Sequence, residues 1–249
     1  MTEKTRLNKA MAMLGICSRR DADKLIEAKQ VSVNNITVTE LGYRISDGSE
    51  IVIAQTQNRY IFKQREIEDN TKVWLYYKPV GIITTHRDNS GRLTVFDDLK
   101  DKIDERVISV GRLDINSEGL LVLTNNGEFA RHAESPRTAW ERRYRVRIFG
   151  YLGNDIIKQL RDGVRINDIR YAPIIVKQID TYHGRNSWID CTLHEGKNRE
   201  IRKVFGHFNI MVNKLIRYKY GPYELGALNP GDVVETPYIP LFRHITSVI

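Results

Sequence analysis

One aspartate stands between two apolar runs in the segment Gly111-Arg112-Leu113-Asp114-Ile115-Asn116-Ser117-Glu118-Gly119. The runs on either side are typical of strands, so Asp114 is predicted to lie on the loop that joins them. A loop held by rigid strands is a common place for a catalytic carboxylate, which acts as a nucleophile or as an electrostatic partner. An aspartate in a turn is more often a local turn former, so this spacing alone leaves both interpretations open.

The sequence lacks the usual markers of metal, nucleotide and hydrolase chemistry. Its six histidines show no His-Glu-x-x-His spacing, and Cys17 and Cys191 are far apart, which argues against a zinc site and a disulfide framework. It contains no Walker-type Gly-x-x-x-x-Gly-Lys-Ser/Thr, no Gly-x-Gly-x-x-Gly after a strand and no Gly-x-Ser-x-Gly. We therefore expect a protein without a metal or a cofactor.

Positive charge is concentrated in two windows of the chain. The 249 residues have a formal net charge of +8, and their 41% apolar and 28% charged residues are typical of a soluble globular protein. Residues 131–147 and 185–220 together carry more than the whole of this excess. Such clusters favour a polyanion-binding surface, because each neutralised phosphate releases counterions, although a solvated basic face remains the alternative.

The first fifty residues predict a small helical unit followed by short strands. Ser18, with Asp21 three residues later, is placed to cap a second helix. Strands are expected at 31–33, 36–38 and 51–53, whereas residues 55–71 lose apolar periodicity and are interpreted as a linker. The first helix is predicted from an apolar stripe at i, i+3, i+4 and i+7, which comprises Leu7, Ala10, Met11 and Leu14.

From residue 72 onward, short apolar runs alternate with glycine turns. Strands are expected over 73–77, 107–110, 120–124, 144–148 and 188–193, and helices over 155–161 and 199–208. Tyr144 shares one strand face with the apolar Val146 and Ile148, while Arg143, Arg145 and Arg147 point the other way. These patterns predict an α+β fold with a largely antiparallel sheet and flanking helices, rather than a doubly wound α/β fold.

Two resemblances add to these patterns. The N-terminal unit resembles the S4 RNA-binding domain through Arg6-Leu7-Asn8-Lys9, Gly15–Arg20 and Val31–Asn34. The segment around Asp114 resembles the pseudouridine synthases of the ribosomal small- and large-subunit family, in which Gly-Arg-Leu-Asp holds the catalytic aspartate. Three further segments are similar to motifs of that family in the same order, namely Tyr76–Gly81, Glu141–Val146 and Glu195–Lys203. The resemblance implies an S4-like domain over 1–54, a linker over 55–71 and a synthase domain over 72–249, with the active-site cleft across its sheet.

The resemblance also implies a reaction and a set of residues for it. The family isomerises a flipped-out uridine of RNA, moving C1′ from N1 to C5 of the base, and it assigns the catalytic carboxylate to Asp114. Arg202 is then expected to pair with this carboxylate through two parallel hydrogen bonds, and Arg112 to fill the space that the uridine leaves. Tyr144 and Ile201 are expected to form walls against the uracil ring. The full set of supporting residues comprises Tyr144, Arg202, Ile201, Arg112, Lys78 and Asn198.

The expected partner is ribosomal RNA. Within the family, the motifs of this sequence are most similar to the large-subunit synthase B branch, which implies 23S rRNA, free or in pre-ribosomal particles. A small-subunit (16S) rRNA synthase and a non-catalytic rRNA-binding or ribosome assembly factor remain the alternatives, whereas a DNA-directed binder has only the net charge in its favour. The N-terminus lacks a leader and no apolar run could span a membrane, so a cytoplasmic protein is expected. A monomer is expected as well, because an S4 unit on a linker would let one chain bind RNA at two points. RNA contacts are expected from Arg6, Lys9, Arg19, Arg20, Arg143, Arg145, Lys197, Arg199 and Lys203.

Overall fold

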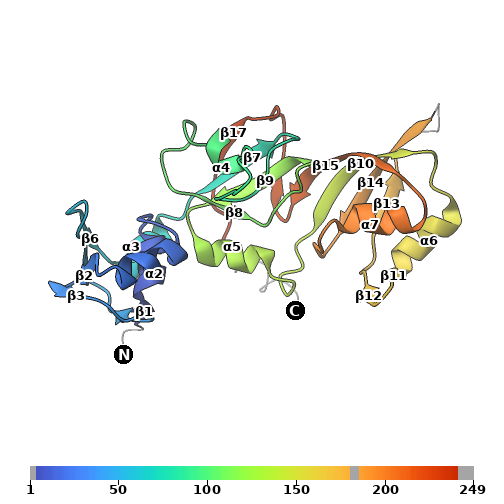
Figure 1. Ribbon diagram of the computed structural model, residues 1–249. Helices are drawn as coiled ribbons and strands as arrows, with labels where there is room; N and C mark the ends of the chain where they lie inside the picture. Colours follow the sequence, from blue (N-terminus) through green and yellow to red (C-terminus); the bar gives the residue numbers. More distant parts are fainter. Residues whose placement is uncertain (1–3, 180–184, 241–249) are drawn as a thin grey trace, which may run out of the picture. The chain divides into compact units, whose positions relative to one another are not determined.

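The computed structural model describes residues 4–179 and 185–240, and the chain divides into two compact units (Figure 1). The first extends to Lys72 and includes the short segments 105–107 and 125–127. The second contains 73–104, 108–124 and the chain from Glu128 onward. The start of the N-terminus at 1–3, two of the six histidines (His183 and His244) and the end of the predicted synthase domain at 241–249 lie outside the described residues.

The first unit packs two helices against short strands, as the sequence predicts. Ser18 begins the second helix, because its side-chain oxygen accepts a hydrogen bond from the Asp21 N–H. The apolar stripe of the first helix is buried, with Leu7, Ala10 and Met11 at most 1% exposed. The elements are α1 (Leu7–Met13), α2 (Arg19–Glu27), the pair β1 (Thr5–Arg6) and β4 (Arg44–Ile45), and a sheet of β3 (Ile36–Thr37), β2 (Val31–Val33), β5 (Glu50–Ile53) and β6 (Arg59–Ile61) in that order.

Residues 55–71, which the sequence predicts to be a linker, form regular secondary structure instead. They contain β6, which pairs antiparallel with β5, and a short helix α3 (Gln64–Asp69). Phe62 between them is 1% exposed and packs in the core of the first unit. The apolar run Tyr60-Ile61-Phe62 is too short to establish a period, so its pairing with β5 could not be predicted from local pattern.

The second unit is built on a nine-stranded sheet. Every pairing in it is antiparallel except that of β15 with β9, which confirms the predicted α+β class with a largely antiparallel sheet. The main order is β13 (Ile175–Gln178), β14 (Asn186–Leu193), β10 (Arg142–Phe149), β15 (Val212–Tyr220), β9 (Glu118–Thr124), β7 (Val73–Lys78) and β17 (Val233–Thr236), with β8 (Ile108–Val110) on β9 and β16 (Tyr223–Glu224) on β15. A separate two-stranded hairpin joins β11 (Arg165–Ile166) to β12 (Ile169–Arg170).

Helices cover the apolar parts of this sheet. Val146 and Ile148 of β10 are fully buried in a core with α6 (Asn154–Asp162) and α7 (Glu200–His207), whereas Arg145 and Arg147 are exposed, as the predicted alternation requires. A second core joins β7, β8 and β9 to α5 (Gly127–Glu134), and the short helix α4 (Val95–Asp98) precedes β8. No helix in the described ranges is long and apolar enough to cross a membrane.

The parallel crossing of β9 and β15 depends on Gly119. This residue has φ +101°, and a Cβ atom built on it would lie 2.3 Å from the Arg217 carbonyl oxygen. Only glycine therefore permits the two strands to approach so closely. The approach brings the loop from Gly111 to Ser117, which precedes β9, next to the residues of β15.

Candidate active site

A cavity of about 840 Å³ opens in the second unit. Three segments bound it: 83–92 before α4, 109–117 between β8 and β9, and 193–201 leading into α7, with further side chains from β10 and β15. Five of the seven predicted catalytic and supporting residues line it, namely Arg112, Asp114, Tyr144, Asn198 and Ile201. Lys78 and Arg202 do not.

The Asp114 loop is held by its backbone rather than by its carboxylate. Asp114 is half-buried, and within residues 4–179 and 185–240 no hydrogen bond or ion pair engages its carboxylate. The carboxylate is therefore open to a ligand in the cavity. The backbone hydrogen bonds of the loop run from Thr84 Oγ1 to Leu113 O, from the Gly81 N–H to Ile115 O, from Arg202 Nη2 to Asn116 O, from the Ser117 N–H to Asp114 O, and from Lys78 Nζ to Ser117 O.

Lys78 is a fully buried cation beneath this loop. Its Nζ donates to Pro79 O and to Ser117 O, both at 2.9 Å. Burial lowers the pKa of Lys78 to about 8, while the negative charges of Asp114 and Glu118 act in the opposite direction. Lys78 thus fixes the end of β7 to the end of the Asp114 loop, and it places a positive charge near the carboxylate without contacting it.

Arg202 differs from the sequence prediction in its partners. Its Nη1 donates to Val212 O and its Nη2 to Asn116 O, both at 2.8 Å, and in the described part of the chain no hydrogen bond or ion pair joins Arg202 to Asp114. Burial and the positive charge of Arg199 lower the pKa of Arg202, and the negative charge of Asp114 opposes this. Arg202 therefore ties the loop to β15 and acts on Asp114 through space.

Apolar side chains form one part of the cavity wall. Tyr144 of β10 is half-buried, while Ile201 of α7 and Leu215 of β15 are 4% and 6% exposed. A flat ring beside two aliphatic groups offers the kind of contact on which a nucleobase packs. Arg112 is exposed beside the loop and also lines the cavity.

The turn before α7 and the first residue of that helix contribute two neighbouring carboxylates, Glu195 and Glu200. Glu200 is 5% exposed, and it accepts a hydrogen bond from the Lys197 N–H at 2.8 Å. Burial, together with the hydrogen bond and negative charge of Glu195, raises the pKa of Glu200. Burial would also raise the pKa of Glu195, but hydrogen bonds from the Ala172 N–H and the Lys197 ammonium group bring it below its usual value. Glu200 is therefore the member of the pair that holds a proton more readily.

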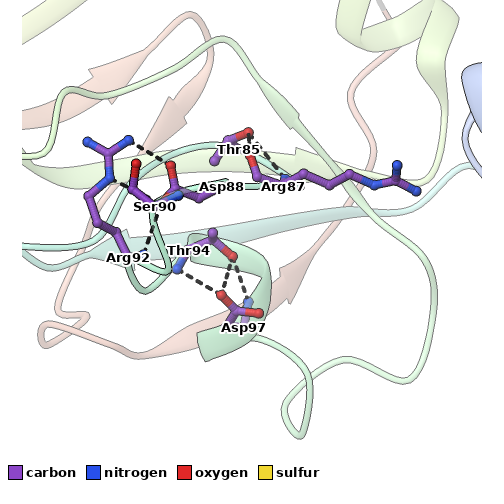
Figure 2. Close-up of polar contacts among 7 residues, drawn as sticks. All are labelled: Thr85, Arg87, Asp88, Ser90, Arg92, Thr94 and Asp97. Carbon is purple, nitrogen blue, oxygen red and sulfur yellow. Dashed lines mark hydrogen bonds and ion pairs between the residues drawn. The ribbon is translucent and has the colours of Figure 1, made fainter.

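Residues 83–92 contribute two arginines, Arg87 and Arg92, to the cavity lining, and Figure 2 shows the polar contacts of this loop. The Asp88 carboxylate accepts hydrogen bonds from the N–H groups of Ser90 and Arg92 and from the Arg92 guanidinium, which lowers its pKa to about 2. The Arg87 side chain extends away from these contacts. Thr94 and Asp97 then form a capping box that begins α4. The loop thus presents Arg87 and Arg92 to the cavity on a fixed backbone.

Sequence reasoning missed two buried arginines of the site. Arg142 and Arg217 are 7% and 3% exposed, and both line the cavity together with Tyr220. Arg142 has the same parity along β10 as Tyr144, so strand alternation places it on the cavity side. Arg217 is buried in the middle of β15, and a buried charge is rare and therefore indicates a function.

The remaining predicted residues lie in several places. Lys197 and Arg199 line the cavity, whereas Lys203 does not and donates to Asn198 Oδ1. Arg143 and Arg145 alternate with Tyr144 on the other sheet face, in ion pairs with Glu141 and Asp190. In the first unit, Arg6, Arg19 and Arg20 are exposed and Lys9 is half-buried. Among the residues that the structure describes, no group of three His, Cys, Asp or Glu is placed to hold a metal ion.

Comparison with known proteins identifies the family. A family model for RNA pseudouridylate synthase matches residues 72–207, and an S4 domain model matches residues 5–51. An uncharacterized RNA pseudouridine synthase of Rickettsia typhi is 42% identical over 230 residues, which cover 92% of this chain and 90% of the relative. The chain belongs to the RNA pseudouridine synthases.

Further relatives of this synthase agree with the assignment. A ribosomal large subunit pseudouridine synthase B of Yersinia pestis is 38% identical over 246 residues, covering 94% of this chain and 74% of the relative. A crystal structure of a pseudouridylate synthase has a TM-score of 0.64 at 21% identity, covering 93% of this chain and 96% of that one, which shows a shared fold. The predicted family, the S4 and synthase organisation, and the class of enzyme, an isomerase, are thus confirmed.

Proposed function

We propose that this synthase converts a uridine of large-subunit ribosomal RNA to pseudouridine, with Asp114 as the reacting carboxylate. The choice of RNA rests on three relatives described as ribosomal large subunit pseudouridine synthase B, which are 36–38% identical over at least 90% of this chain. The choice of Asp114 rests on one observation, a carboxylate that lines the cavity without a partner in the described part of the chain, on a loop held by other groups.

The reaction needs a charged carboxylate and a base that can turn within an enclosed space. The N1–C1′ bond of uridine breaks, a C5–C1′ bond forms, the proton on C5 leaves to solvent, and N1 gains a proton. A carboxylate reacts as an anion, and nearby cations favour its charged form. Lys78 and Arg202 hold their positive charges on the Asp114 loop, and Tyr144 and Ile201 provide surfaces that would retain the detached base.

A uridine stacked in RNA must leave its helix or loop to reach Asp114. Extrusion costs a few kcal/mol, less for a base that is already unpaired. We assign the filling of the vacated space to Arg112, which is exposed beside the Asp114 loop. Phosphate contacts are assigned to Lys197 and Arg199 at the cavity, to Lys203, to Arg143 and Arg145 on the other sheet face, and to Arg6, Lys9, Arg19 and Arg20 of the first unit.

Tritium release from RNA that carries 5-tritiated uridine tests this proposal. Wild type is expected to release tritium from a 23S rRNA transcript and not from a 16S transcript. Asp114→Asn is expected to lower the rate on the order of 1,000-fold or more while RNA affinity stays within about threefold. Asp104→Asn, a change of the same charge at an exposed residue outside the cavity, is the matched control and should behave as wild type.

Each alternative has its own outcome in this assay. Release from the 16S transcript alone would indicate a small-subunit enzyme. Tight RNA binding by wild type without any release would indicate an rRNA-binding or ribosome assembly factor. Equal release by wild type and Asp114→Asn would remove Asp114 from the reaction.

A further inference from the structure

The guanidinium groups of Arg142 and Arg217 both lie over the ring of Tyr220. Their guanidinium carbons lie 5.0 Å and 4.8 Å from the ring centroid. In the sheet register, Arg142 is opposite Tyr220 and Tyr144 is opposite Arg217, so all four side chains belong to the cavity side of β10 and β15. The Tyr220 hydroxyl donates to Ala133 O at 3.1 Å, which anchors the ring to α5. The two cations are therefore held in fixed positions at the cavity wall.

The hydrogen-bond partners of these arginines are almost all neutral backbone groups. Arg142 donates to Trp140 O at 2.8 Å, to His194 O at 3.1 Å and to the Tyr220 hydroxyl at 3.4 Å. Arg217 donates from Nε to Leu120 O at 2.8 Å, while its enclosed Nη2 has no partner. In the described part of the chain, neither guanidinium forms an ion pair with a carboxylate.

Two buried cations without a counter-charge are costly for the free protein. Burying an ion removes its hydration, and a tyrosine face and carbonyl dipoles replace that hydration here without adding a negative charge. In the described part of the chain, none of the five carboxylates that line the cavity forms an ion pair with Arg142 or Arg217. Asp88 is paired with Arg92, Glu195 with Lys197, and Glu134 accepts a hydrogen bond from the Gly111 N–H. In all, seven basic and five acidic residues line the cavity, so an excess of positive charge remains for a ligand.

We propose that Arg142 and Arg217 form a phosphate subsite, which holds a phosphodiester group of the RNA at or beside the target nucleotide. This inference rests on the proposed function for the presence of RNA, and it adds the group that the cavity recognises besides the uracil base. A planar guanidinium binds phosphate oxygens through two parallel hydrogen bonds, and Arg217 Nη2 is a donor still without an acceptor. The cavity volume of about 840 Å³ is within the range that holds a nucleotide-sized ligand.

Binding of two small probes separates phosphate recognition from base recognition. Uridine 3′,5′-bisphosphate and uridine are titrated into the full-length protein by isothermal calorimetry. Wild type is expected to bind the bisphosphate at least tenfold more tightly than uridine. Arg217→Gln and Arg142→Gln are each expected to lower the affinity for the bisphosphate about 10- to 30-fold and to leave uridine affinity within twofold. Arg161→Gln, at an exposed residue of α6, is the matched control and should change neither.

A second measurement uses RNA and guards against unfolding. Each variant is first compared with wild type by far-UV circular dichroism and thermal denaturation. The slope of log affinity for the rRNA transcript against log salt concentration is then expected to become shallower by about 0.7 to 0.9 for each arginine removed, which corresponds to one lost phosphate contact.

Three outcomes would overturn the phosphate subsite. They are a wild type that binds the bisphosphate no better than uridine, folded variants that retain bisphosphate affinity, and variants that lose affinity for both probes equally. Failure of the proposed function is distinguishable, because a wild type that releases no tritium from rRNA would still show the difference between the two probes.

Discussion

Replacing Lys78 with methionine tests how the Asp114 loop is held. Methionine keeps most of the apolar chain and removes the ammonium group that donates to Pro79 O and Ser117 O. The buried Ser117 carbonyl and the partly buried Pro79 carbonyl then lose a partner, at a cost of up to about 1–3 kcal/mol each. Part of this loss is returned, because the variant no longer buries a charge. The balance between the two effects must therefore depend on pH.

The sign follows from the pKa of Lys78, which is about 8 in the folded protein and 10.5 for an unperturbed lysine. Between these values the unfolded chain binds more protons than the folded chain, so the free energy of unfolding rises with pH. Above pH 10.5 the group is neutral in both states and the burial penalty disappears, whereas below pH 8 it is present in full. The difference in unfolding free energy between wild type and Lys78→Met is expected to increase by up to about 3 kcal/mol from pH 8 to 10.5.

Urea denaturation followed by tryptophan fluorescence measures this difference for the relevant unit. The three tryptophans, Trp74, Trp140 and Trp188, all lie in the second unit. Lys158→Met, at an exposed residue of α6, is the control and should show no such dependence. A loosened loop is also expected to lower kcat 10- to 100-fold with KM for RNA nearly unchanged. A stability difference between wild type and Lys78→Met that is constant with pH, or that decreases as pH rises, would refute the reasoning.

Three further changes test other parts of the site. Because the pKa of Glu200 is raised on folding, the unfolding free energy of wild type is expected to fall as pH rises above 4.5 toward neutrality. Glu200→Gln should remove this pH dependence, as measured by urea denaturation. An unchanged dependence would contradict the assignment of the proton to Glu200. Gly119→Ala places a Cβ atom 2.3 Å from the Arg217 carbonyl oxygen and is expected to destabilise the second unit by about 3 kcal/mol or more, measured by the same fluorescence assay. An unfolding free energy equal to that of wild type would contradict this prediction. Tyr144→Phe keeps the aromatic wall and is expected to retain the rate of tritium release within about fivefold of wild type. Tyr144→Ala should lower kcat/KM about 10- to 100-fold. Equal losses in both variants would indicate a role for the hydroxyl group instead.

Local hydrophobic periodicity was sufficient to predict the strand and the helix that carry Tyr144 and Ile201. The alternation of Tyr144, Val146 and Ile148 along β10 and the stripe of Ile201, Val204 and Phe205 along α7 each report burial on one side of one element. The position of Asp114 between two strands follows from the same kind of pattern. These features depend on neighbours in sequence, so the sequence could predict them.

The missed features depend on contacts between distant parts of the chain. The buried residues of β15 are Val212, Leu215, Arg217 and Tyr220, a spacing that follows no simple hydrophobic pattern. Arg217 becomes part of the cavity through the pairing of β15 with β10 and β9. Lys78 and Arg202 each donate to one carbonyl oxygen of the Asp114 loop and to one outside it, and the direction of a carbonyl is set by the fold rather than by residue type. The sequence shows the charges of Arg202 and Asp114 but not the directions of the carbonyl groups. It therefore predicts a pair between the two charges rather than hydrogen bonds to carbonyl oxygens.

The central claim, that the Asp114 carboxylate isomerises a uridine of large-subunit rRNA, is tested most directly in cells. Pseudouridines are mapped along 23S rRNA from cells that lack this protein and from the same cells supplied with wild type or Asp114→Asn. The account predicts one position that loses pseudouridine in the deletion, regains it with wild type and does not regain it with the variant. Restoration by Asp114→Asn, or no change at any position of 23S rRNA, would contradict it.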